Sequence, residues 1–318
     1  VFIGDAKHCK GKKKITMQIK FSVSLVIPNW NGLSLLEKNL PHWIKAKNFS
    51  GNHISEIVIV DDKSTDDSLF FLRKNYSKEV KIVAHKVNRG FSSAVNTGVR
   101  TAKSQLVCLL NTDVIPSNDF LVSVVKDFND DKVFAVSLHE RGYGYAKALF
   151  ESGFVVHRPG SEKNKPVESF WASGGSCVVR RDIWMELGGF DEKLFSPFYW
   201  EDVDLGYRAH KRGYKVLWEP NARVIHKHES VINEKSFRRS WLNLIKERNH
   251  LLLNWKNLTS PALFKKHKIG LRKRILTHPG YLKVFIAALL KYSDVKMARD
   301  REKKESTVSD ESVFAKFS

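Results

Sequence analysis

This sequence predicts an α/β fold, in which helices cover both faces of a mainly parallel central sheet. Over residues 22–111, continuous apolar runs alternate with stretches of helical spacing. Fully apolar runs are typical of strands buried on both faces, and strand–helix alternation is typical of parallel sheets. Polar residues also follow directly after the strand ends, where sheets of this kind bind their ligands. A ligand site is therefore expected at the carboxyl edge of the sheet.

The elements of the first half follow from hydrophobic period and turn residues. Buried strands are predicted over residues 22–28, 56–62, 80–85 and 105–111. Helices are predicted over residues 33–46, 64–76 and 91–102. Ser64, with Asp67 three positions later, has the pattern of a helix N-cap.

The second half is less regular. The segment 133–150 begins as a strand and becomes irregular, and 170–191 is predicted as loop, short strand, helix and turn. A helix over 199–214, strands around Pro220 over 215–230 and a helix over 235–257 follow. Beyond Ser260 the chain is basic and helical in tendency, and past Asp294 it is expected to be mobile apart from a closing SVFAKF.

Three regions result from this pattern. Residues 1–20 are expected to be a basic tail, disordered or derived from an expression vector, with no functional role. Residues 21–260 form the α/β domain, and residues 261–318 form a basic helical extension.

The charge is concentrated at the two ends. The 318 residues carry 54 Lys and Arg against 34 Asp and Glu, a net charge of +20. Residues 1–20 hold +5 of this excess and residues 261–318 hold +8. Basic ends suit an anionic membrane surface or nucleic acid, or they are merely solvated.

No apolar run reaches the ~18 residues of a transmembrane helix. The longest candidate is VFIAALL at 284–290, and no secretory signal is expected at the N-terminus. Cys9, Cys108 and Cys177 are widely spaced and form no CxxC pair. A reducing cytoplasm, without disulfides or a zinc site, is the expected setting.

Two acidic motifs are candidates for chemistry. Asn111 and Asp113 stand two apart at a strand end, where extended backbone directs both side chains the same way. Carboxylate oxygens suit Mg²⁺ or Mn²⁺, although for the pair taken alone an Asx turn after the strand is the more common explanation. The stretch YWEDVDLG at 199–206 contains three acids after two aromatic residues. It reads either as a helix start or as the location of a catalytic base.

Eight segments then carry a resemblance. They are IPNWNG, IVIVDDKSTDDS, NRGFSSAVNTG, LLNTDV, ASGGSCVVRRDIW, GGFDEKLF, YWEDVDLGYRAHKRGY and VIH. Each is weak alone, but in this order and spacing the chain resembles an inverting family-2 glycosyltransferase of the GT-A fold. It is most similar to the bacterial branch that includes rhamnosyltransferases and related surface-polysaccharide enzymes. The resemblance covers about residues 21–260.

The resemblance implies a nucleotide site. The loop after the first strand and the acid after the second would hold the nucleoside, with Asp61 accepting the imide N–H of uracil or thymine. Asp62 is the alternative, or it caps the turn. The residues implied in nucleotide binding are Pro28, Asn29, Trp30, Asp61, Asn88, Gly90, Asn111 and Thr112.

The resemblance also implies a metal, Mg²⁺ or Mn²⁺. In this sequence Asn111 replaces the first aspartate of the family's Asp-x-Asp metal motif. Asp113 is therefore the expected direct ligand, and Asn111 would bond ribose or a metal-bound water. His226 matches a histidine that completes the site in relatives, and His228 is the runner-up.

Asp202 matches the family's catalytic base. An aromatic wall would raise its pKa by desolvation, whereas the helix N-terminus would lower it, so the net shift stays open. Glu201 and Asp204 are expected to be helix-dipole partners or hydrogen-bond anchors. The residues implied in contacting the donor or acceptor sugar are Trp171, Gly174, Gly175, Trp200 and Glu201.

The expected function is metal-dependent, inverting transfer of a sugar from a nucleotide-diphosphate sugar to a glycan hydroxyl. The donor would be dTDP-rhamnose or a UDP-hexose, and the acceptor a cell-surface or lipid-linked glycan. A dehydrogenase would need GxGxxG where IPNWNG stands. A nucleotide-binding or nucleic-acid-binding protein without transferase activity is the alternative, but the terminal charge argues against a nucleic-acid partner. The protein would be cytoplasmic and peripheral at the inner face of the membrane, with residues 261–293 on anionic lipid. The alternative is that the short apolar helix around Val284, Phe285, Ala288 and Leu289 packs on the catalytic domain and that the lysines of this segment are merely solvated.

Overall fold

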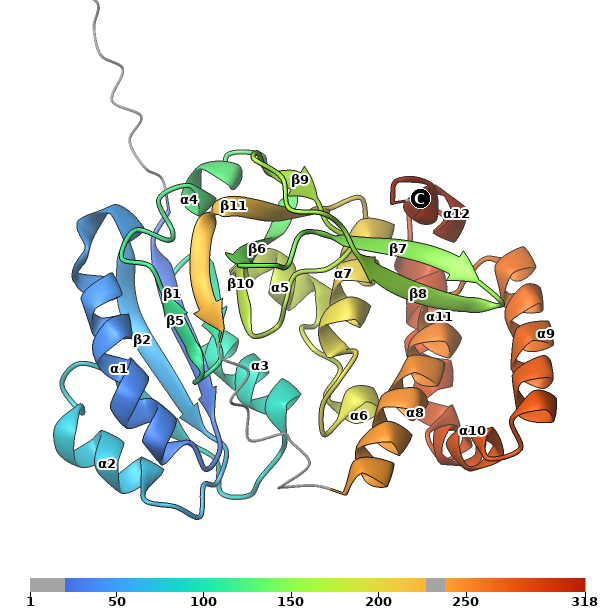
Figure 1. Ribbon diagram of the computed structural model, residues 1–318, viewed down its shortest axis with the longest axis horizontal. Helices are drawn as coiled ribbons and strands as arrows, with labels where there is room; N and C mark the ends of the chain where they lie inside the picture. The colour runs from blue at the N-terminus through green and yellow to red at the C-terminus, as the bar shows by residue number, and fades with distance from the viewer. Residues whose placement is uncertain (1–20, 227–237, 318) are drawn as a thin grey trace, which may run out of the picture.

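A computed structural model describes residues 21–226 and 238–317 (Figure 1). Its first four long strands confirm the predicted parallel arrangement. β1 (Val23–Asn29), β2 (Ile54–Asp61), β3 (Lys81–Ala84) and β4 (Leu106–Leu110) pair in the order β3-β2-β1-β4, all in parallel. Each begins and ends within two residues of its predicted position. Their carboxyl ends therefore lie together at one edge of the sheet, and the polar residues that follow these strands are gathered there.

The other half of the sheet is mixed. From β4 the order continues through β10 (Ser176–Arg180), β6 (Val133–Glu140), β11 (Lys215–His226) and β5 (Val114–Pro116), with β9 (Val167–Glu168) paired to β11. Only β10 and β5 on this described path run against the other six strands. The sheet is thus mainly parallel, as predicted. One strand, β11, crosses Pro220 where two were expected, and its register with β6 breaks between Trp218 and Arg223.

Helices cover both faces because alternate strand residues point to opposite sides. Leu25 and Ile27 of β1 pack with α1 (Leu33–Asn48), whereas Val26 packs with α3 (Phe91–Thr101). The α3 face also holds α5 (Arg181–Leu187) and α7 (Glu201–Lys211). The short elements are η1 (Ser50–Asn52), α4 (Val124–Asp127) and α6 (Glu192–Phe195).

The predicted cap of the second helix is wrong. α2 spans Ser68–Asn75 with Asp67 at its N-cap, so the helix begins four residues after Ser64. The Ser64 hydroxyl instead accepts hydrogen bonds from the Asn29 side chain (3.2 Å) and the Asn31 amide (2.9 Å). A serine hydroxyl bonds neighbouring backbone as well in a loop as in a cap. Here it joins the loops that follow β1 and β2.

A hairpin occupies the stretch predicted to be irregular. β7 (Ala146–Glu151) and β8 (Phe154–Pro159) form a separate two-stranded antiparallel sheet. Figure 1 shows this ribbon reaching from the centre of the molecule to α9 (Pro261–Thr277). At its tip Gly153 has φ +88°, and a Cβ there would lie 2.8 Å from the Lys266 carbonyl. The close approach of hairpin and helix therefore depends on this glycine.

The C-terminal region is helical, as predicted, but the expected mobility past Asp294 is wrong. α8 (Arg239–Asn257) and α9 are followed by α10 (Tyr281–Leu289), α11 (Tyr292–Glu305) and α12 (Asp310–Ala315). All five share one apolar cluster with α7. Two acids of this region are buried in ion pairs, Glu302 with Arg212 (2.7 Å) and Asp310 with Lys211 (3.0 Å). Among the described residues, no helix is both long enough and apolar enough to cross a bilayer.

Candidate functional site

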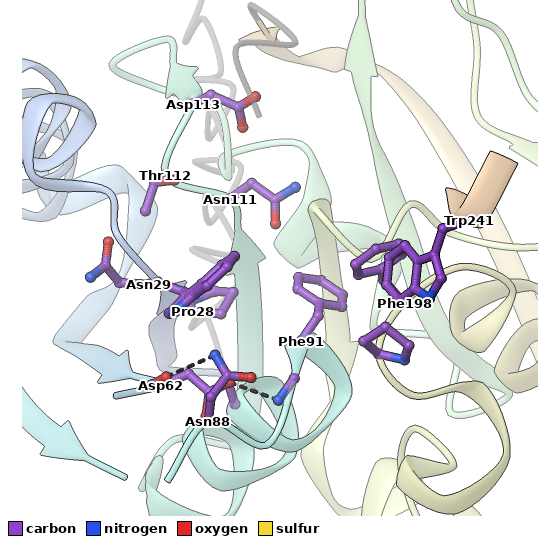
Figure 2. A pocket seen from close by; sticks show the side chains of 14 residues that line it. Pro28, Asn29, Asp62, Asn88, Phe91, Asn111, Thr112, Asp113, Phe198 and Trp241 are labelled. Atoms are coloured by element: carbon purple, nitrogen blue, oxygen red, sulfur yellow. Dashed lines mark hydrogen bonds between the residues drawn. The ribbon is translucent and has the colours of Figure 1, made fainter. Parts of the chain in front are cut away.

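A cavity of about 320 Å³ opens at the carboxyl edge of the four parallel strands (Figure 2). Figure 2 shows polar side chains from the strand ends on one side and the rings of Phe91, Phe198 and Trp241 on the other. The lining residues that follow strand ends are Pro28, Asn29, Trp30, Asp62, Asn88, Gly90, Asn111, Thr112 and Asp113. The fold thus gathers into one cavity seven of the eight residues expected to bind nucleotide, together with Asp113.

Asp61 is the exception, because its carboxylate holds loops together. It accepts hydrogen bonds from the Asn29 side chain (3.0 Å) and the Ser64 amide (3.1 Å), is buried, and does not line the cavity. Asp62, the stated alternative, does line it. The Asp62 carboxylate accepts from the amides of Arg89 (2.9 Å) and Gly90 (2.7 Å). The Asp62 carboxylate is also buried and lies 2.6 Å from His85 Nδ1, so of the two acids Asp62 is the one that lines the cavity, but both carboxylates hold loops together.

Gly90 has a structural role in addition to its place in the cavity wall. Its φ is +86°, and an added Cβ would lie 3.1 Å from the Pro197 carbonyl. Glycine is thus required here by the backbone conformation and by the segment before α7. This contact brings the loop of residues 88–90 against the far wall of the cavity.

Asp113 and His226 meet at one end of the cavity. The Asp113 carboxylate lies 3.2 Å from His226 Nε2, and His226 Nδ1 lies 3.3 Å from the Glu140 carboxylate. Burial would lower the pKa of His226, but hydrogen bonds and charges from the two acids outweigh it and raise that pKa. The other Asp113 oxygen, Oδ2, is buried without a hydrogen-bond partner among the described residues. His228, the other candidate, lies outside the described residues.

A glycine loop connects this cavity to Asp202. The Asn111 amide donates to the Gly175 carbonyl (2.8 Å), and a Cβ on Gly175 would lie 2.4 Å from the Asn111 side chain. The neighbouring Gly174 amide donates to Asp202 Oδ2 (3.2 Å). Asp202 therefore adjoins the cavity through this loop without lining it.

The environment of Asp202 decides the pKa shift that the sequence left open. Burial raises its pKa to about 6, although amides including those of Gly174 and Val203 lower it. Burial and the charge of Asp202 also raise the pKa of the neighbouring Glu201. Desolvation therefore outweighs the helix N-terminus. A carboxylate with such a pKa is ionised at neutral pH yet more basic than an ordinary aspartate.

Asp204, in contrast, is an anchor. Its buried carboxylate accepts hydrogen bonds from Arg208 (2.8 Å), Lys256 (2.9 Å) and Asn257 (2.8 Å). Lys256 and Asn257 belong to α8, so this network fixes the start of α7 against α8. Of the alternatives considered for Asp204, the hydrogen-bond anchor is the one that its contacts match.

Sequence reasoning missed Asn249, which supports the approach to Asp202. Tyr199 and Trp200 both have φ +77°, a strained conformation for bulky residues. The Asn249 side chain donates to the carbonyls of Phe195 (3.0 Å), Phe198 (2.9 Å) and Tyr199 (3.0 Å). A polar residue on the otherwise apolar side of the 235–257 helix was the available signal.

A second cavity, of about 370 Å³, lies beside the first. It shares the 171–176 loop with the Asp202 side, and both Glu140 and His226 line it. Several of its walls are aromatic, namely Tyr143, Tyr145, His157, Trp171 and Trp218. The Trp171 indole N–H is buried with no hydrogen-bond partner in the described part of the chain. Asp113 lines the first cavity and His226 lines the second, so the contact between these two side chains lies between the cavities.

The predicted aromatic wall divides between two roles. Trp171 lines the second cavity, whereas Trp200 lines neither cavity and stacks on His250 at a centroid distance of 4.4 Å. The His157 ring packs edge-on against both indoles. Trp200 is therefore a packing residue in this structure.

Comparison with known proteins identifies the family. The model of the glycosyltransferase-like family 2 matches residues 21–249. The chain is 25% identical over 222 residues to the O-antigen chain rhamnosyltransferase WbaN of Salmonella anatum, covering 65% of this chain and 66% of that protein. It is 27% identical over 190 residues to the pre-mycofactocin glycosyltransferase of Mycobacterium tuberculosis, covering 56% and 38%. The match thus spans less than two thirds of either relative.

Solved structures show the same fold at low identity. GalNAc-T7 with UDP, GalNAc and Mn²⁺ superposes with a TM-score of 0.61 at 18% identity, covering 82% of this chain and 57% of that one. The mannosyltransferase PcManGT from Pyrobaculum calidifontis, with GDP-Man and Mn²⁺, has a TM-score of 0.53 at 18% identity, covering 90% and 84%. The fold is GT-A, and the chain belongs to the family-2 glycosyltransferases.

Proposed function

We propose that this protein is an inverting glycosyltransferase that moves a sugar from a nucleotide-diphosphate sugar to a hydroxyl of a glycan. The observation that carries the proposal is that two cavities lie on either side of the Asp113–His226 contact, while Asp202 accepts a hydrogen bond from the Gly174 amide nearby. A transferase needs separate places for donor and acceptor that meet where the bond changes.

The donor binds in the first cavity. The nucleoside lies between the Pro28–Trp30 loop and Asp62, and the diphosphate extends toward Asp113. The donor is dTDP-rhamnose or a UDP-hexose. The rhamnosyltransferase relative supports the first choice, and so does the apolar wall of Phe198 and Trp241, which suits the methyl group of a 6-deoxy sugar.

A divalent ion, Mg²⁺ or Mn²⁺, fits the end of the cavity near Asp113. Asp113 Oδ2, which has no hydrogen-bond partner among the described residues, and the adjacent His226 would supply two ligands, and such ions commonly take the rest from substrate phosphates and water. Within the described residues no three His, Cys, Asp or Glu side chains are grouped to hold an ion by themselves. When bound, the ion would stabilise the charge of the leaving diphosphate. Mn²⁺ accompanies the nucleotide in both structures compared above.

The acceptor binds in the second cavity. Its aromatic walls match the apolar faces of sugar rings. Asp202 removes the proton of the acceptor hydroxyl as its oxygen attacks the anomeric carbon. The nucleoside diphosphate leaves in the same step, so the anomeric centre is inverted. No covalent enzyme intermediate is needed.

A glycan acceptor carried on a lipid would place the enzyme at the cytoplasmic face of the membrane, as a peripheral protein. The O-antigen chain rhamnosyltransferase relative supports a glycan acceptor of this kind.

The test is a panel of dTDP- and UDP-sugars, assayed for release of nucleoside diphosphate with and without a lipid extract as the acceptor source. We expect one donor class to be turned over, faster when acceptor is present. Binding of nucleotide without turnover of any donor would instead support a nucleotide-binding protein without transferase activity. Asp202→Asn is the control that separates enzymatic release from contamination.

A further inference from the structure

α10 is apolar on two opposite sides, and only one of them is packed. The packed side faces α8 and consists of Tyr281, Val284 and Ala288. The other side, the α10 apolar face, follows the helical period i, i+4, i+7, i+8 and consists of Leu282, Ile286, Leu289 and Leu290. The exposed fractions of these four residues range from 43% to 83%. A helix that is apolar all round is normally covered all round, but no described part of this chain covers this face.

The chain around this face is exclusively basic. Residues 261–293 contain eight Lys and Arg and no Asp or Glu. Six of the eight are exposed, here called the basic set: Lys265, Lys266, Lys268, Arg272, Lys273 and Lys283. Ile269 and Leu276 add exposed apolar side chains on α9. Tyr292 follows directly, and Lys with Tyr beside aliphatic residues is typical of a membrane interface.

We propose that α9 and α10 bind the surface of an anionic lipid bilayer, with the α10 apolar face inserted among the acyl chains and the basic set on the headgroups. The charge selects this partner. A second copy of the same face would bring two uncompensated basic sets together, whereas an anionic bilayer satisfies both the charge and the apolar side chains. Lysine stems can also lie along the apolar boundary with their ammonium groups in the headgroups.

The placement gives this surface a role that rests on the proposed function. α9 and α10 lie at the end of the molecule farthest from α1 and α2 (Figure 1). The hairpin β7–β8 connects that end to the second cavity, because its tip contacts α9 while His157 and Arg158 line the cavity. A protein docked through α10 would thus direct its acceptor cavity toward lipid-linked substrates.

The experiment is co-sedimentation of the full chain with vesicles of phosphatidylcholine, with and without about one third phosphatidylglycerol, at low and high salt. Two double variants test the two parts of the surface, Leu282→Gln with Leu290→Gln and Lys265→Gln with Lys273→Gln. The matched controls, also exposed but on other elements, are Phe70→Gln with Met185→Gln and Lys45→Gln with Lys126→Gln. The basic residues 1–20 are the same in every protein, so differences report on α9 and α10.

We expect binding to the anionic vesicles that weakens with salt, with a partition coefficient at least about tenfold lower in each test variant and unchanged in each control. Absence of binding by the wild-type chain, or equal binding by the Leu282 and Leu290 variant, would overturn the proposal. A wild-type dimer in size-exclusion chromatography that this variant dissociates would show instead that the face binds a second copy. Vesicle binding requires no donor and no turnover, so its failure is separate from failure of the transferase proposal.

Discussion

Replacing Asp202 with asparagine tests the catalytic assignment most directly. The amide keeps the shape and can still accept hydrogen bonds from the Gly174 and Val203 amides, but it cannot take up a proton. Loss of a general base lowers the rate by ~10²–10⁴. Donor affinity should change little, because Asp202 does not line the donor cavity. Radiolabelled transfer and calorimetric binding of the nucleoside diphosphate measure the two quantities separately.

The raised pKa of Asp202 also predicts the pH profile of the reaction. Burial raises the pKa of Asp202 to about 6, and only the ionised form can accept a proton. The rate kcat/KM should therefore fall about tenfold per pH unit below that value and level off above it, and Asp202→Asn should lose this acid limb. The raised pKa also means that the folded state binds the proton more tightly than the unfolded state. Folding stability should thus decrease as pH rises from about 4 to 6, and the variant should be at least as stable at pH 7.

Asp204 provides the contrasting variant. Its carboxylate pairs Arg208 and Lys256 in the interior, so Asp204→Asn should reduce the free energy of unfolding by about 3–5 kcal/mol. The chemical step should suffer less than in Asp202→Asn at a temperature where both are folded. If Asp204→Asn loses more turnover than Asp202→Asn while remaining as stable as the wild type, the assignment of the base is wrong.

Further tests address the metal and the C-terminal helices. Asp113→Ala should abolish transfer and weaken binding of the nucleoside diphosphate in the presence of Mn²⁺. The melting temperature should change only slightly, because His226, the ion-pair partner of Asp113, keeps its contact with Glu140. Full activity of the wild type in excess chelator would contradict the metal-dependent mechanism. Asp310→Ala leaves the buried Lys211 ammonium without that carboxylate and should cost about 3–5 kcal/mol of folding free energy in chemical denaturation, whereas Asp300→Ala, at an exposed pair, should cost less than about 1 kcal/mol.

Local pattern determined the first half of the protein. A strand buried on both faces has to be continuously apolar, so β1, β2 and β4 were visible as runs, and parallel pairing then placed their polar ends together. That placement predicts the polar cavity residues Asn29, Asp62, Asn88, Asn111 and Asp113, whereas the family resemblance implied the others, Pro28, Trp30, Gly90 and Thr112. The ordered motifs, each placed after a strand or at a helix start, indicated the family.

Tertiary structure decided what depends on contacts between distant residues. Which of Asp61 and Asp62 faces the cavity depends on hydrogen bonds to Ser64 and Gly90. The pKa of Asp202 depends on desolvation, which requires the whole surrounding fold.

The charged end of the chain shows the same limit. From its sequence this segment is expected to be solvated. In the fold, however, Asp310 and Glu302 are buried in ion pairs with Lys211 and Arg212. The spacing of apolar residues in the sequence shows which faces of a helix are apolar, but only the packing of the fold shows which of these faces other elements cover. The two sides of α10 therefore look alike in the sequence, and one of them is exposed in the fold.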